Sequence, residues 1–290
     1  MLKNKIEYFL FISVVKTVNI FGIKKARIFA NVLAFIFYSI LKLRKKVVID
    51  NLTKAFPNKP HQEILSIAKE NYFHISLTFI EMMCVPYTSQ EEIIKMVSSE
   101  TDHKIKQLHG LGKGLILLTA HMGNWELIPA AFARKLGIEI HLLSKNQRNG
   151  YITDWITNMR KVHGNKIVML GQSVRDIFKV LMDGGIVGVV GDQRGSIESQ
   201  RVKYFGIDTA VYSGTASIAL KLHSPILLAM IIRQPDYTYK VDFIELNYDH
   251  LDGKDEERII KINQKYMNIL EEYVREHPEQ WFWMHNIWKY

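Results

Sequence analysis

The sequence predicts an α/β protein in which a largely parallel, mixed sheet is flanked by helices. From residue 114 onward, short apolar runs alternate with amphipathic stretches at helical spacing. Repeated strand–helix–strand order favours parallel strands whose two faces are both covered by helices. The 290 residues are 48% hydrophobic and 23% charged, which is typical of a globular chain and excludes extensive disorder. One large core with a helical appendage accounts for this length.

Residues 1–46 predict a helical segment that associates with a membrane. The segment is rich in Phe, Ile, Leu and Val, and its helices are expected to hinge near Gly22. Its longest uncharged run, residues 28–41, has 14 residues, fewer than the roughly 20 that a membrane-spanning helix needs. We therefore expect amphipathic or shallowly inserted helices, and no removable signal peptide. The alternative, that these helices cover the core of a soluble protein, stays open.

Residues 47–290 predict a second unit, with a helical lead-in over 47–110 and an α/β core over 111–290. In the lead-in, apolar residues at helical spacing run over 62–85, and Pro86 ends that helix. No internal repeat or low-complexity segment interrupts this unit.

Six strands and four helices are expected in the core. Ser173 is expected to cap one of these helices and Gly184 to end it. The expected strands are 115–120, 138–143, 166–170, 186–191, 226–232 and 240–246, and the expected helices are 126–136, 151–162, 173–183 and 255–276.

His121 is the predicted catalytic base, and Glu126 is its predicted partner. His121 follows the apolar run 114–120, and ligands of α/β sheets bind where strands end. Glu126 comes five residues later, where the chain turns into a helix, so its carboxylate is expected beside the imidazole. Such a carboxylate fixes the tautomer and leaves the other ring nitrogen to take a proton from a hydroxyl. In the alternative, His121 only forms a hydrogen bond to a loop. Glu126 is then an ordinary acidic residue in the first turn of a helix, where the helix dipole favours a negative charge.

Further polar residues are expected at the same edge of the sheet. The strand 186–191 is followed by Asp192, Gln193 and Arg194, which present a carboxylate, an amide and a guanidinium together, and Arg160 lies near the end of a predicted helix. The planar fork of donors on arginine suits phosphate and carboxylate groups. A surface ion pair between Asp192 and Arg194, and a cation at a helix C-terminus for Arg160, remain alternatives.

The formal net charge of +9 indicates an anionic partner, which is a nucleic acid, a membrane surface or an acidic protein. No zinc-finger spacing, RNA-binding signature or helix-turn-helix is visible, so no nucleic-acid partner is predicted. A membrane is favoured because basic residues flank the apolar run 28–41, and each contributes about 1 kcal/mol near anionic headgroups. These flanking residues are Lys24, Lys25, Arg27, Lys42, Arg44, Lys45 and Lys46.

Cysteine and histidine usage predicts neither a disulfide nor a metal site. Cys84 is the single cysteine, which excludes an intramolecular disulfide, and its apolar surroundings predict a buried thiol. The 11 histidines show no clustered ligand spacing with carboxylates. No metal or cofactor is therefore expected, and a reducing, cytoplasmic setting fits.

The segment from His121 to Glu126 resembles the signature of glycerolipid acyltransferases, in which four residues separate a histidine from an acid. Its form, His-Met-Gly-Asn-Trp-Glu, is similar to that of the late acyltransferases of lipid A biosynthesis, the lauroyl and myristoyl transferases. The resemblance covers nearly the whole chain and includes the closing segment 277–285, His-Pro-Glu-Gln-Trp-Phe-Trp-Met-His. Other matching positions follow in the family's order: Asn51-Leu52 with Phe56-Pro57, Arg160 with Gly164, Asp192-Gln193, Tyr204-Phe205-Gly206, the small-residue helix 214–220, and Pro225.

The resemblance implies a glycerol-3-phosphate acyltransferase-like fold and O-acyl transfer without a covalent enzyme intermediate. The implied donor is an acyl thioester, usually of acyl carrier protein or else acyl-CoA. The implied acceptor is a hydroxyl of a phosphorylated, glucosamine-based lipid at the cytoplasmic face of the bacterial inner membrane. His121 is then the general base, with Glu126 as its partner or as a support of the site.

The same resemblance implies residues that bind substrate. Arg160 is implied to contact substrate, and its guanidinium or the backbone N–H groups near Gly123 and Asn124 are expected to stabilise the negative charge on the thioester oxygen. The chain departs from the family pattern at Asn286-Ile287, where members usually carry arginines. The predicted substrate-binding residues are Gly123, Asn124, Arg160, Asp192, Gln193, Arg194 and Phe205.

Three other functions stay open at this point. The first is an acyltransferase for another lipid, such as lysophosphatidate or a mannosylated lipid. The second is a hydrolase, although no Gly-x-Ser-x-Gly nucleophile elbow accompanies His121. The third is a basic peripheral membrane protein without activity.

Overall fold

The structure, a computed structural model, describes residues 2–170 and 174–290. The strands of its main sheet are β1 (Val97–Ser98), β2 (Leu115–Thr119), β3 (Ile140–Ser144), β4 (Lys166–Met169), β5 (Ile186–Val190), β8 (Ile226–Arg233) and β9 (Tyr239–Glu245). Within the described residues these seven strands are ordered β1-β9-β8-β2-β5-β3-β4. Neighbours are parallel except β8 and β9, which are antiparallel. The predicted largely parallel, mixed sheet is confirmed.

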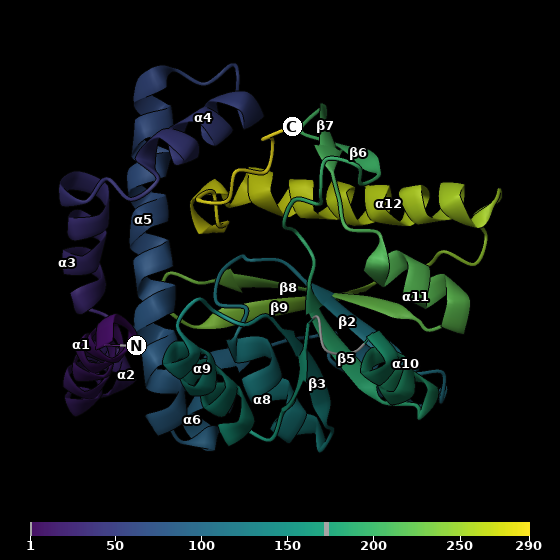
Figure 1. Cartoon of the computed structure of the whole chain (residues 1–290), viewed down its shortest axis with the longest axis horizontal. Coiled ribbons are helices and arrows are strands. Elements are labelled where there is room, and N and C mark those ends of the chain that lie inside the picture. The colour runs from purple at the N-terminus through teal and green to yellow at the C-terminus, as the bar shows by residue number, and fades with distance from the viewer. Residues whose placement is uncertain (1, 171–173) are drawn as a thin grey trace.

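Helices cover both faces of the sheet (Figure 1), and its central strands are therefore apolar on both sides. All eight residues of β8 are buried. Leu227 and Ile231 belong to one hydrophobic core, and Leu228 and Met230 to the other. The first core includes residues of α6 (Gln90–Met96), α7 (His103–His109), α8 (Leu127–Leu136) and α9 (Gly150–Val162), and the second includes residues of α10 (Val174–Met182), α11 (Gly214–Leu222) and α12 (Asp255–Glu276).

The lead-in consists of α4 (Lys45–Ala55), the long α5 (His61–Cys84) and the 3-10 turn η2 (Val85–Tyr87). α5 stands beside the sheet (Figure 1). It contributes residues to both cores. Cys84 is buried, as predicted, and burial raises the pKa of its thiol to about 12. The thiol is therefore neutral at physiological pH.

The predicted strands and helices of the core are all present, with ends that differ by a residue or two. The strand expected from residue 138 begins at Ile140 because the N–H of Ile138 donates to the carbonyl of Ala133 and closes the end of α8, where Gly137 has a φ of +64°. Ser173, the predicted cap, lies outside the described residues. The two-residue β1 and the separate hairpin of β6 (Arg201–Tyr204) and β7 (Ile207–Ala210) were not predicted.

The N-terminal helices lie along α5 at one edge of the molecule (Figure 1). They are α1 (Leu2–Ile20), α2 (Gly22–Ala26), α3 (Phe29–Phe35) and the π-helical turn η1 (Ile36–Ile40), and the expected hinge at Gly22 has a φ of +67°. Among the described residues, no single helix is long and apolar enough to cross a membrane. The segments 2–20 and 22–40 together meet that test as one pair bent by 112°.

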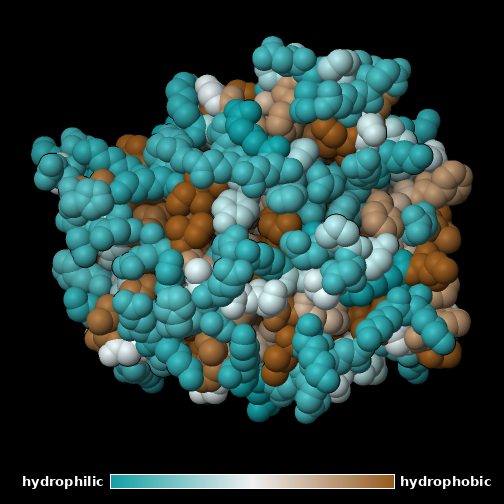
Figure 2. Space-filling view, turned by 180° about the vertical axis from the view of Figure 1, so that it is seen from behind, coloured by the Kyte–Doolittle hydropathy of each residue, from teal (hydrophilic) through white to brown (hydrophobic). Residues whose placement is uncertain are grey.

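Many apolar side chains of these helices are exposed. In Figure 2, hydrophobic residues gather along the edge of the molecule where the N-terminal helices lie. The exposed apolar residues are Leu2, Ile6, Phe9, Leu10, Val14, Ile20, Phe21, Ile28, Val32, Phe35, Ile40, Leu41 and Leu43.

Candidate active site

His121 lies in the loop that follows β2, at the carboxyl edge of the parallel strands. The loop is pinned from outside the sheet: the carbonyl of His121 accepts from the N–H of Phe282 at 2.9 Å, and Met122 forms a β-bridge with Trp281. The imidazole packs edge-on against Trp125, with ring centroids 4.8 Å apart, and its side chain stays 19% exposed. The ring is thus fixed at the rim and still open to a ligand.

The carboxylate beside this imidazole belongs to Asp192, which follows the neighbouring strand β5. The Nδ1 of His121 lies 2.6 Å from Oδ1 of Asp192. The backbone N–H of His121 and the indole Nε1–H of Trp281 both donate to Oδ2, each at 2.8 Å. Burial alone would raise the pKa of the Asp192 carboxyl, but the His121 charge and these hydrogen bonds outweigh burial and lower the pKa. Asp192 is therefore a carboxylate at neutral pH.

This arrangement fixes the tautomer of the imidazole. With an ionised Asp192 as acceptor, Nδ1 of His121 carries the proton, and Nε2 is left with its lone pair. No group among the described residues bonds to Nε2. The structure therefore presents one basic nitrogen at the rim of the sheet.

The predicted pairing of Glu126 with His121 is wrong. Glu126 is buried at the start of α8, where Arg160 of α9 binds it with two bonds, from Nε to Oε2 at 2.9 Å and from Nη2 to Oε1 at 2.5 Å. Nη1 of Arg160 donates to the hydroxyl of Ser144, at the end of β3, at 2.9 Å. Burial favours the neutral form, but the bonds and charge of Glu126 raise the pKa of Arg160. The acid of the motif thus ties α8 to α9 and β3.

A narrow cavity of about 30 Å³ opens between the carboxyl halves of β2, β3 and β5. Glu126 and Arg160 form its polar part, and Trp125, which touches His121, forms part of its apolar wall. The remaining lining residues are Leu117, Thr119, Ile128, Pro129, Leu142, Leu143, Gly188, Val189 and Val190. The cavity is therefore a mostly apolar slot that reaches Trp125, the ring that packs against the imidazole of His121.

Gly123 and Asn124 are buried and bonded within the protein. The N–H of Gly123 donates to the carbonyl of Gln280 at 3.1 Å, and its carbonyl accepts from Thr78 at 2.7 Å. At a φ of +54°, a Cβ on Gly123 would lie 2.5 Å from the carbonyl oxygen of Ile231, so glycine is required there. The side-chain amide of Asn124 donates to Glu81. The N–H of Gly123 is thus already engaged within the protein, which leaves the Arg160 guanidinium and the N–H groups that follow Gly123 as the expected donors to a thioester oxygen.

Arg194 lies close to the site but does not pair with Asp192, since no such ion pair occurs among the described residues. Its N–H donates to Nε2 of His285 at 3.0 Å, and its Nη1 donates to the carbonyl of Asn286 at 2.9 Å. Burial and the charge of Arg194 lower the pKa of His285 to about 4 against the opposing effect of Asp192. His285 is therefore a neutral imidazole next to the Asp192 region.

Among the described residues, no hydrogen bond or ring contact joins Gln193 or Phe205 to the His121–Asp192 pair. Gln193 is exposed, and the structure gives it no hydrogen-bond partner among the described residues. Phe205 lies in the turn between β6 and β7, where it packs in an aromatic cluster with Phe56, Trp283 and Trp288. Its place is that of a core residue.

Sequence reasoning missed Trp281 and Glu81. Trp281 was part of the closing segment 277–285 but had no role, because nothing local says that its indole reaches Asp192. The sequence does contain a signal for Glu81, because it is the one acidic residue in the apolar stretch 79–85. A lone acid in a buried helix needs bonding partners, and this indicates a structural or functional role.

A comparison with protein families covers the whole chain. The family model described as bacterial lipid A biosynthesis acyltransferase matches residues 1–290. No curated protein matches the sequence significantly. The match includes the His121 loop, Asp192 and the closing segment that supplies Trp281.

Proposed function

Since this chain belongs to the bacterial lipid A biosynthesis acyltransferase family, we propose that His121 is the general base that activates the acceptor hydroxyl. The protein is an acyltransferase, and its acceptor is a precursor of lipid A. The observation that carries the proposal is the His121–Asp192 pair at the carboxyl edge of the sheet, with Nε2 free and the ring partly exposed.

The proposed reaction needs one imidazole and no covalent enzyme intermediate. Nε2 of His121 takes the proton of the acceptor hydroxyl while the hydroxyl oxygen attacks the carbonyl carbon of the acyl thioester. The C–O bond forms, the carbon–sulfur bond breaks, and the leaving thiolate takes the proton from the imidazolium. The carboxylate of Asp192 stabilises the imidazolium between these two transfers.

The slot beside Trp125 is the proposed place for the first part of the acyl chain. Its apolar walls suit methylene groups, each of which contributes about 0.8 kcal/mol on leaving water. Glu126 and Arg160 line the same slot, which supports the proposal that Arg160 contacts the substrate while it holds Glu126. The cavity measures only about 30 Å³, so we expect the side chains around it to move apart when an acyl chain enters.

Arg194 is the proposed contact for a phosphate of the acceptor. One of its nitrogens is committed to Asn286, whereas no described group bonds to Nη2. Its guanidinium lies 4.6 Å above the ring of Tyr290, which holds its plane in place. A fixed guanidinium near a basic imidazole would orient a phosphorylated lipid with its hydroxyl at His121.

The donor is proposed to be the thioester of acyl carrier protein, and the test is a comparison of donors. Purified protein is given a lipid A precursor with either acyl carrier protein thioester or acyl-CoA, and released thiol is measured with and without acceptor. We expect thiol release that depends on the acceptor, matches the acylated lipid formed, and has the higher kcat/KM with the carrier protein. Equal release without acceptor would show hydrolysis, and higher kcat/KM with CoA would refute the proposed donor.

The N-terminal helices are proposed to bind the cytoplasmic face of the inner membrane. Their exposed apolar side chains and flanking lysines match the two contributions that hold a helix at an anionic bilayer surface. Replacing both Phe9 and Phe35 by Glu is expected to weaken binding to anionic vesicles more than tenfold, because each buried Phe contributes roughly 1.5–3 kcal/mol. Co-sedimentation measures this change.

The matched control carries the same two charges elsewhere. Ile197 and Met182 are also exposed but lie outside the N-terminal helices. Replacing both by Glu changes the net charge by the same amount but leaves the N-terminal helices intact. Vesicle binding is therefore expected to stay within about threefold of wild type. Equal weakening by the two double variants would contradict the proposed membrane surface.

A further inference from the structure

A buried carboxylate lies directly beneath the His121 loop. Glu81 of α5 has no exposed surface, and its Oε2 accepts from the side-chain amide of Asn124 at 3.0 Å. Oε2 also accepts from Nη2 of Arg233 at 3.3 Å and from the hydroxyl of Tyr239. Oε1 accepts from Nε of Arg27 at 2.8 Å. A charge buried in this way is held in one position by all of its partners together.

The network reaches the His121 loop at two points. Besides the bond from Asn124 to Glu81, the hydroxyl of Thr78 donates to the carbonyl of Gly123 at 2.7 Å. Thr78 in turn accepts from Nη2 of Arg233 at 2.9 Å, so both contacts depend on the same guanidinium and carboxylate. Gly123 and Asn124 follow His121 by two and three residues. A shift of Glu81 therefore moves the backbone that carries the base.

Arg27 brings the N-terminal helices into this network. It follows α2 directly, its side chain is 11% exposed, and its Nη2 donates to the carbonyl of Tyr237 at 2.9 Å while Nε binds Glu81. The path from the N-terminal helices to the loop is thus two bonds long, from Arg27 to Glu81 and from Glu81 to Asn124. Neither Arg27 nor Glu81 touches the reacting atoms.

We propose that Arg27 and Glu81 are positioning residues, which couple the packing of the N-terminal helices against α5 to the geometry of the His121 loop. The inference rests on the proposed role of His121. When Arg27 is lost, Glu81 keeps Arg233 and Tyr239, so the charge stays paired, but the carboxylate is drawn toward Arg233 and takes Asn124 with it. The imidazole then meets the acceptor hydroxyl in a less productive orientation.

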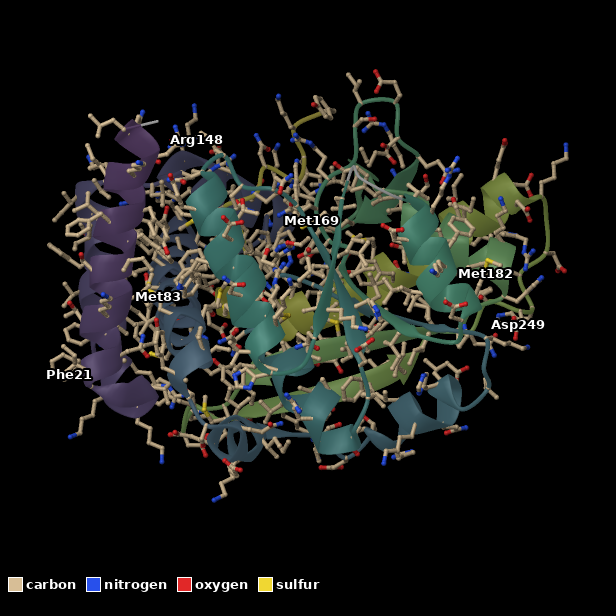
Figure 3. The ribbon with its side chains drawn as sticks, turned by 60° about the horizontal axis from the view of Figure 1, so that its bottom comes forward. Phe21, Met83, Arg148, Met169, Met182 and Asp249 are labelled. Carbon is tan, nitrogen blue, oxygen red and sulfur yellow. The ribbon has the colours of Figure 1, made fainter. Side chains whose placement is uncertain are left out.

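The test compares two arginines that each tie the N-terminal helices to the core. Arg148 donates from Nη2 to Oε1 of Glu7 in α1 at 2.8 Å, and within residues 2–170 and 174–290 it has no bond to the network of Glu81. Figure 3 shows Arg148 near one end of α1 and Phe21, six residues before Arg27, at the other. Arg27→Gln and Arg148→Gln each remove one cation and one ion pair, the first with Glu81 of α5 and the second with Glu7 of α1.

We expect Arg27→Gln to lower kcat on the order of tenfold with KM within about twofold of wild type, because misplaced catalytic groups lose rate more than binding. Arg148→Gln is expected to leave both constants within about twofold. Arg27→Lys keeps the positive charge but lacks the planar fork of donors, so its kcat is expected to lie between those of Arg27→Gln and wild type. Circular dichroism melting and vesicle binding, measured on all three, report folding and docking separately.

Each outcome decides a different statement. A kcat of Arg27→Gln equal to that of Arg148→Gln overturns the coupling, as does a loss confined to KM. If Arg27→Gln melts well below wild type, Arg27→Lys decides, and wild-type kcat in that variant overturns the coupling. Failure of the proposed function would look different: wild-type protein would transfer acyl groups with no dependence on His121, whatever the behaviour of Arg27.

Discussion

Replacing His121 by Ala is expected to lower kcat for acyl transfer by about 100- to 10,000-fold, the usual contribution of a general base. The hydroxyl of the acceptor then has no group at the rim to take its proton. The protein is expected to stay folded and to bind vesicles as before, because the loop is held by the backbone contacts of His121 and Met122 with the closing segment rather than by the imidazole. Initial rates with saturating donor and acceptor measure the loss.

The control for this variant is His61→Ala. His61 is an exposed histidine at the start of α5 and has no part in the site. The His61→Ala variant is expected to keep wild-type rates. This result would show that removing a histidine elsewhere in the chain does not by itself lower the rate. Turnover by the His121 variant within about threefold of wild type would refute the role of His121 as the base.

Asp192→Asn is expected to lower kcat nearly as far, by about 100- to 10,000-fold, although it changes a single atom. The backbone N–H of His121 and the indole of Trp281 both donate to Oδ2, so the amide oxygen of the asparagine takes that place. The amide NH₂ then faces Nδ1 of His121 and requires it to accept. The proton moves to Nε2, and the nitrogen that faces the substrate no longer acts as a base.

Two measurements separate this effect from loss of folding. Nitrogen NMR of labelled histidine is expected to show the proton of His121 on Nδ1 in wild type and on Nε2 in Asp192→Asn. The melting temperature is expected to change much less than the rate, since the asparagine keeps the same shape and accepts from the same two donors. A variant that loses its rate with an unchanged tautomer contradicts the mechanism given for Asp192.

The sheet was predictable from sequence because its central strands are continuous apolar runs. β8 is buried over its whole length, and such a run between amphipathic stretches has few other interpretations. β1 has two residues, too few for periodicity to distinguish from loop, and the strands of the separate hairpin β6–β7 carry no continuous apolar run. One edge strand of the main sheet and the hairpin were therefore missed, while the central strands and the other edge strand, β4, were found.

The site was predictable as a set of residues but not as a set of pairs. His121 and Asp192 were both expected at the rim, yet the acid assigned to His121 was the one nearest in sequence. Asp192 is 71 residues away and meets the imidazole because β2 and β5 are neighbours in the sheet. Strand order is not contained in local patterns, and neither is the approach of Trp281 or Glu81. Glu126 and Arg160 were both expected in the cleft, and the structure pairs them with each other.

The contact of Trp281 with Asp192 has a consequence for biosynthesis of the protein. A ribosome that has translated as far as α12 has already made every strand of the sheet and the imidazole itself, but not the indole that steadies the acid. The nascent polypeptide is therefore expected to lack the steadied His121–Asp192 pair until the segment that carries Trp281 has been made and has docked.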